Sequence, residues 1–152
     1  MTDSAFDADT FLNTSIEAEM DTRAPTIPAA EYKALIDNIK ARKAKDSRML
    51  DIFYELIECD QLKADLGREK VVVRQTVFLD FNDQGALELG KGTGKNAQLG
   101  RVREAVGQNT GAPWAPSMLK GAGPVMIAVS LRPDDNDPDI QYNDVKRVVA
   151  AI

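Results

Sequence analysis

Residues 69–81 read Glu-Lys-Val-Val-Val-Arg-Gln-Thr-Val-Phe-Leu-Asp-Phe, a stretch rich in β-branched and aromatic side chains. Such side chains pack well on a pleated surface, so the stretch favours a long β-strand. Alternate positions divide it into two faces, which are Val71, Val73, Val77 and Leu79 on one side and Val72, Arg74, Thr76 and Phe78 on the other. We expect the more apolar face to be buried in a β-rich domain.

Further strands are predicted before and after this stretch. Residues 49–58 alternate between an apolar face, formed by Leu50, Ile52, Tyr54 and Leu56, and a mixed face, formed by Asp51, Phe53, Glu55 and Ile57. Residues 124–131 are predicted to form a buried strand, and residues 140–152 a last strand or helix. Between the strands at residues 69–81 and 124–131, Asn96 can cap a helix that runs to about Gln108.

Residues 29–45 are ambiguous. Their large apolar side chains fall at i, i+3, i+4 and i+7, namely Tyr32, Leu35, Ile36 and Ile39. This spacing is typical of one face of a helix, whereas strand alternation is weaker here. Periodicity alone therefore predicts a helix.

The charge of the chain is unevenly distributed. The 152 residues carry a net charge of −5, and residues 1–28 account for all of it, with six acids and one base. Pro25 and Pro28 close this segment and favour an extended backbone. We therefore expect a flexible acidic arm over residues 1–28 and a single binding domain over residues 29–152.

Several functional classes are disfavoured by composition. There is no histidine and only one cysteine, Cys59, so the commonest general base and the usual zinc ligands are missing. The glycine-rich stretch at residues 90–95 does not match a phosphate-binding loop, because Leu89 and Asn96 stand at positions that need Gly and Ser or Thr. We expect no enzyme activity, no cofactor and no metal site. The lack of a long apolar run or a basic leader predicts a cytoplasmic protein without membrane contact.

Basic and aromatic side chains are the remaining candidates for function. Proteins that bind single strands combine cations for the phosphates with flat side chains on which bases stack. The cations proposed for this role are Lys40, Arg42, Lys43, Lys45, Arg74, Lys91 and Lys95, and the stacking side chains are Phe53, Phe78 and Trp114, with Tyr54 and Tyr142 as further candidates. The competing interpretation is that the aromatic residues fill the core and the cations are solvated surface charges.

Several short stretches resemble a family of bacteriophage-encoded single-stranded-DNA-binding-like proteins. They are Ala30-Glu31-Tyr32-Lys33-Ala34, Val77-Phe78-Leu79-Asp80, Lys95-Asn96-Ala97-Gln98-Leu99-Gly100-Arg101, Ala112-Pro113-Trp114, Leu119-Lys120-Gly121 and Tyr142-Asn143-Asp144-Val145-Lys146. The similarity spans about residues 28–152. It implies an OB-fold, a five-stranded barrel with one helix between the third and fourth strands. In that fold residues 32–42 would be the first strand.

The resemblance also implies a function. The protein would coat single-stranded DNA during phage replication or recombination in the host cytoplasm, with self-association left open. The acidic arm would compete with DNA for the basic surface or recruit replication and recombination proteins. The alternative is a structural or protein-interaction component of a phage particle or replication complex that does not bind DNA.

Overall fold

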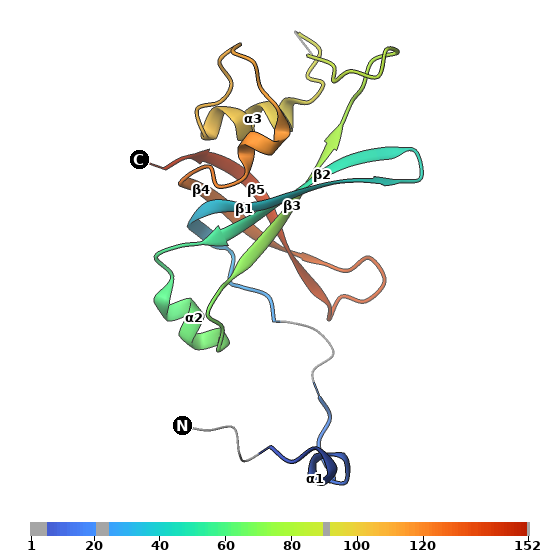
Figure 1. Ribbon diagram of the computed structural model, residues 1–152, viewed down its shortest axis with the longest axis vertical. Coiled ribbons are helices and arrows are strands. Elements are labelled where there is room, and N and C mark those ends of the chain that lie inside the picture. The colour runs from blue at the N-terminus through green and yellow to red at the C-terminus, as the bar shows by residue number, and fades with distance from the viewer. Residues whose placement is uncertain (1–5, 21–24, 90–91, 152) are drawn as a thin grey trace.

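The computed structural model describes residues 6–20, 25–89 and 92–151 (Figure 1). Along the chain the elements are α1 (Ala8–Leu12), β1 (Ala30–Ala44), β2 (Ser47–Leu56), α2 (Asp60–Leu66), β3 (Val72–Leu79), α3 (Ala97–Ala105), a 3-10 turn (Pro116–Leu119), β4 (Val125–Pro133) and β5 (Gln141–Ala150). The prediction of a mainly β domain is confirmed, and residues 140–152 contribute a strand rather than a helix.

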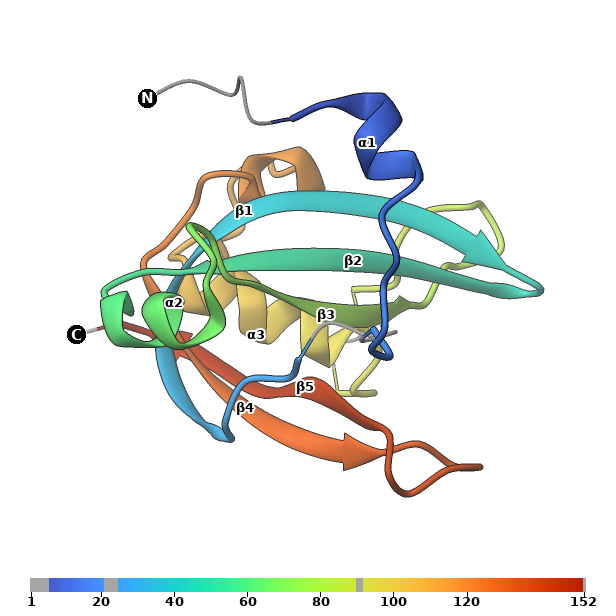
Figure 2. The ribbon, with the colours of Figure 1, turned by 90° about the horizontal axis from the view of Figure 1, so that it is seen from below.

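The five strands form one antiparallel sheet in the order β3-β2-β1-β4-β5. The sheet is open, because β3 and β5 are its edges and no strand pairing joins them in the described part of the chain. The predicted closed barrel is therefore present only as a five-stranded open sheet. Figure 2 shows how the sheet bends, with β1, β2 and β3 on one side and β4 and β5 turned away from them.

Strand β1 is the element that joins the two halves. Its first residues, Ala30–Ala34, pair with β4, whereas Ala34–Ala44 pair with β2. Where the two pairings meet, the Ile36 N–H donates to the Ala122 carbonyl at 2.9 Å and the Gly121 N–H donates to the Ile36 carbonyl at 2.7 Å. The middle of β1 thus has backbone partners on both sides.

The helix that periodicity predicts at residues 29–45 is wrong, and the strand implied by the family resemblance is confirmed. The cause is a β-bulge between Ile36 and Asn38, which inserts one extra residue into β1. Ala34 and Ile36 face the core, and beyond the bulge Ile39 takes over the inward position. The spacing of three between Ile36 and Ile39 comes from this bulge and not from a helical turn.

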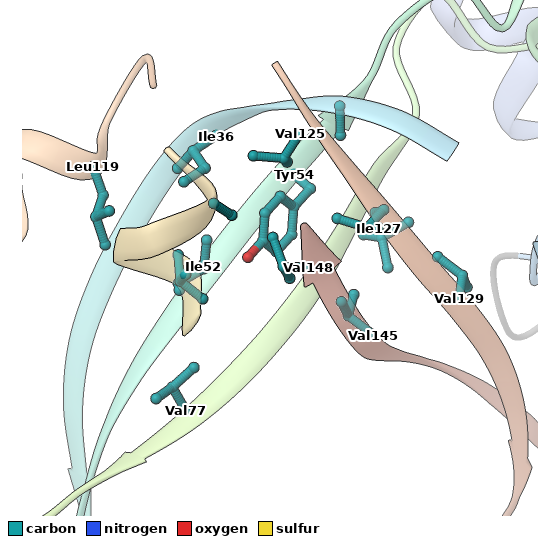
Figure 3. Close-up of a cluster of buried hydrophobic side chains, with 14 of the residues drawn as sticks. Ile36, Ile52, Tyr54, Val77, Leu119, Val125, Ile127, Val129, Val145 and Val148 are labelled. Carbon is teal, nitrogen blue, oxygen red and sulfur yellow. The ribbon is translucent and has the colours of Figure 1, made fainter. Parts of the chain in front are cut away.

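The core lies on the concave side of the sheet. The predicted apolar face of β2 is buried in full, with Leu50, Ile52, Tyr54 and Leu56 at most 3% exposed. Figure 3 shows Ile52 and Tyr54 together with Val125, Ile127, Val145 and Val148 from the other half of the sheet. The Tyr54 hydroxyl donates to Gln75 Oε1 at 2.7 Å, and burial raises the pKa of Tyr54, so the hydroxyl keeps its proton.

Helix α3 packs on this core through Leu99, Val102 and Ala105 and is shorter than predicted. Asn96 stands at the position before its first turn, but its side chain does not cap the helix. Instead Asn96 Nδ2 donates to the carbonyls of Asp80 and Glu88 at 2.9 and 2.8 Å. Asn96 therefore holds the loop that leads out of β3. Helix α2, which ends at Gly67 in a left-handed conformation, was not predicted.

The N-terminal segment joins the domain at one buried residue. Residues 6–20 are exposed throughout, whereas Ile27 is only 4% exposed and belongs to the core cluster. The Ile27 N–H donates to Asn143 Oδ1 at 2.9 Å, and Asn143 Nδ2 donates back to the Ile27 carbonyl at 3.0 Å. Part of the predicted arm, residues 1–28, is thus fixed to β5.

Replacing Tyr54 by Phe should lower the free energy of unfolding by about 1–2 kcal/mol, because Gln75 would lose its partner in the core. Urea denaturation followed by circular dichroism measures the change. Tyr142→Phe is the matched control, since its hydroxyl binds Asp134 at the rim of the β4–β5 hairpin. Equal losses for both variants would contradict the role given to the buried hydroxyl.

Candidate nucleic-acid interface

Strand register gathers half of the predicted binding residues on one surface. Direct cross-strand neighbours on the side of β1, β2 and β3 turned away from the core form three rows, namely Asn38–Phe53–Arg74, Lys40–Asp51–Thr76 and Arg42–Met49–Phe78. We call this surface the outer face. Five of the ten predicted residues lie on it, and they are Lys40, Arg42, Phe53, Arg74 and Phe78.

A buried carboxylate sits in the middle of the outer face. Asp51 is 2% exposed, and it accepts hydrogen bonds from Arg42 Nε at 2.6 Å and from Thr76 Oγ1 at 2.7 Å. Burial raises the pKa of Asp51, but these hydrogen bonds and the charges of Arg42 and Arg74 outweigh it and leave the pKa below its usual value. The ionised carboxylate fixes the Arg42 guanidinium, so part of that charge is already neutralised.

The aromatic side chains differ in how far they emerge. Phe78 is 59% exposed on the edge strand β3, whereas Phe53 on the central strand β2 is half-buried between its neighbours. Tyr54 lies in the core, and its ring has no free face for a base. Phe78 is therefore the ring on this surface best placed to receive a stacked base.

A groove continues from the outer face into the gap between the edge strands β3 and β5. Its lining includes four cations, Arg68, Arg74, Arg132 and Lys146, and two aromatic side chains, Phe78 and Tyr142. Arg132 stacks over the Tyr142 ring, with its guanidinium carbon 5.1 Å from the ring centroid. Arg132 Nε also lies 2.8 Å from Asp144 Oδ2. The predicted set omitted Arg68, which lies just before β3, and Arg132 and Lys146 on β4 and β5. Arg132 and Lys146 come opposite β3 only because the sheet bends.

Four other predicted residues that the structure describes do not join this surface. Lys43 projects from the opposite side of β1 to Arg42, and Lys45 lies in the β1–β2 turn with a φ of 55°. Lys95 and Trp114 line a second pocket beside α3. Lys91 lies outside the described residues.

Trp114 has a structural role in that second pocket. Its indole Nε1 donates to Gln108 Oε1 at 2.7 Å, and the Arg103 guanidinium lies 4.2 Å from the ring centroid. The ring also packs against the core cluster. These contacts use both the edge and a face of the indole, so Trp114 holds the loop after α3 in place.

Metal clusters and membrane-spanning helices are two further features to be considered in the described part of the chain. No group of three or more His, Cys, Asp or Glu side chains in it is arranged to hold a metal ion. None of its helices has both the length and the apolar character needed to cross a bilayer.

Comparison of the whole chain with protein-family models and with curated proteins finds no match. The resemblance to phage-encoded single-stranded-DNA-binding proteins therefore stays a prediction.

Replacing Asp51 by Asn should cost about 1–3 kcal/mol of unfolding free energy at pH 7, because Arg42 loses its ionised partner. The folded-state pKa of Asp51 is lowered, so its contribution is complete above the unfolded carboxyl pKa of about 4 and disappears as the pH falls through the folded value. The difference between the two proteins should therefore shrink below about pH 4.

Denaturation at a series of pH values measures this difference. Asp144→Asn is the control, because the Arg132–Asp144 pair is more exposed and its loss should change the free energy of unfolding less. A constant difference between Asp51→Asn and the unmodified protein from pH 7 to pH 3 would show that ionisation of Asp51 does not matter.

Proposed function

We propose that this protein binds single-stranded DNA on the outer face of β1, β2 and β3, with the strand continuing into the groove between β3 and β5. The observation that carries this proposal is the shared surface of Lys40, Phe53, Arg74 and Phe78. Cations and rings from three strands alternate there over a sheet surface, which is the chemistry that single-strand binders use.

The topology supports an OB-like barrel that is partly open. OB-folds are five-stranded Greek-key barrels, commonly incomplete, that bind oligonucleotides on the face of the second and third strands. The order β3-β2-β1-β4-β5 would give such a barrel if β3 and β5 came together, and the shared groove already has lining residues from both strands. Helix α3 lies between β3 and β4, as the resemblance implies.

The residues divide into different roles. Arg74 and Lys40 flank the face with charges suited to phosphates, while Arg68 and Lys146 extend the positive lining along the groove. Phe78 offers a ring for stacking, which contributes about 1–3 kcal/mol per base in such proteins. Arg42 acts mainly as a positioning residue, since Asp51 holds its guanidinium. Binding of this kind tolerates sequence and involves no chemical step, which suits a role in phage DNA replication or recombination.

Fluorescence polarisation with a labelled oligo-dT tests the proposal. Binding should weaken steeply with salt, and Phe78→Ala should raise the dissociation constant about 5- to 150-fold at constant salt. Met118→Ala is the matched control, because Met118 is an exposed apolar side chain outside the outer face and the groove. Arg74→Ala should weaken binding and reduce the salt slope by about 0.7, as expected for one lost phosphate contact.

The same assay decides against the proposal if no binding is seen at low salt. The alternative, a structural or protein-interaction component, would then be preferred. A loss on Met118→Ala equal to that on Phe78→Ala would contradict the placement of the site while leaving DNA binding itself intact.

A further inference from the structure

The N-terminal segment contains the short helix α1, whose first turn is fixed by a side-chain cap and by an aromatic contact. Asp7 Oδ1 accepts hydrogen bonds from the N–H groups of Asp9 and Thr10 at 3.0 and 3.4 Å, which caps α1. The ring of Phe6, just before the cap, lies 5.9 Å from the ring of Phe11 in the helix. This pair is a hydrophobic staple, which fixes how the chain enters a helix.

The large apolar side chains of this segment are mostly exposed to solvent. Phe6, Phe11, Leu12, Ile16 and Met20 are between 58% and 75% exposed. Residues 6–20 also carry Asp7, Asp9, Glu17 and Glu19 and no base. Large apolar side chains grouped on an exposed and preorganised element mark a binding surface. A surface complementary to this segment would be an apolar cleft bordered by cations.

Such a cleft lies at the hairpin end of β1 and β2. Its apolar lining is Ala41, Met49, Leu79 and Phe81, and its charged lining is Arg42, Lys43 and Arg48. We call it the hairpin cleft. No acidic side chain lines it, so its chemistry is complementary to that of the N-terminal segment.

Two of these cations stand in an unfavourable arrangement. Lys43 and Arg48 are direct cross-strand partners, and like charges in that position destabilise a sheet. Neither has a carboxylate within ion-pair distance among the residues that the structure describes. The Arg48 guanidinium lies 4.7 Å from the Phe81 ring centroid, beside the apolar lining. An acidic and aromatic ligand would relieve the repulsion and contact the apolar lining.

We propose that the N-terminal segment of one copy of this chain binds the hairpin cleft of a second copy. Phe11 and Leu12 cover the apolar lining, and Asp9 approaches Lys43 and Arg48. The two surfaces differ, so the contact is head-to-tail and can join copies in a row. In Figure 1 α1 lies well away from the hairpin end of β1 and β2 in its own chain. A DNA phosphate could meet the two cations, but it would leave the apolar lining uncovered.

The test is self-association of the full chain without DNA, measured by sedimentation velocity over a range of concentrations. The unmodified protein should associate as its concentration rises. Phe11→Ala with Leu12→Ala, or Lys43→Glu with Arg48→Glu, should weaken association at least about tenfold. Val149→Ala and Arg101→Glu are the controls, because these side chains are exposed outside the hairpin cleft and should change nothing.

Mixing the two double variants makes the test specific. One variant keeps an intact cleft and the other an intact N-terminal segment, so the mixture should form one-to-one complexes although neither protein associates alone. Lys43→Gln with Arg48→Gln serves as the cleft variant if the Glu pair disturbs folding, which circular dichroism would reveal.

Three results would overturn the inference. They are a strictly monomeric unmodified protein, a mixture of the double variants that stays monomeric, and cleft variants that lose oligo-dT binding while self-association is unchanged. The last result would make the hairpin cleft a phosphate site. Failure of the unmodified protein to bind oligo-dT would refute only the proposed function, since association is measured without DNA.

Discussion

The structure depends on the double pairing of β1. This strand is hydrogen-bonded to β4 at its start and to β2 along the rest of its length, so it carries the chain from one half of the sheet to the other. The bulge between Ile36 and Asn38 lies where the partners change, and bulges increase local bending and twist. Without that bend, the apolar faces of β2 and of β4 would not meet over a common core.

The bend also creates the candidate binding surface. Turning β4 and β5 away from β1–β3 leaves β3 and β5 as edges that face each other across a groove. Residues on edge strands are less covered than those on central strands, and accordingly Phe78 emerges while Phe53 is half-buried. The outer face tolerates a buried Asp51 only because Arg42 and Thr76 satisfy its oxygens. The same hydrogen bonds that stabilise the buried carboxylate also neutralise part of the positive charge of Arg42.

The alternation of apolar and polar residues predicted strand faces well wherever it was uninterrupted. Alternation in residues 49–58 and 69–81 correctly predicted the buried apolar face of β2 and the side of β3 that carries Arg74 and Phe78, but it did not indicate that Asp51 on the other face of β2 is buried too. Periodicity gave the wrong element at residues 29–45. The bulge in β1 shifts the inward-facing positions by one residue, and nothing in the local composition marks it. It also gave Asn96 a capping role, whereas its side chain binds the carbonyls of Asp80 and Glu88, which are distant in sequence.

Local sequence was enough to establish the β-rich class, the two faces of β2 and β3, and the concentration of negative charge before residue 29, because each of these depends on neighbouring residues alone. The folded chain was needed to show that Arg68, Arg132 and Lys146 join Arg74 in one groove, that Lys43 lies off the outer face that carries Arg42, and that Ile27 is buried. These facts depend on strand register and on the bend in the sheet, which are set by contacts between residues far apart in the chain.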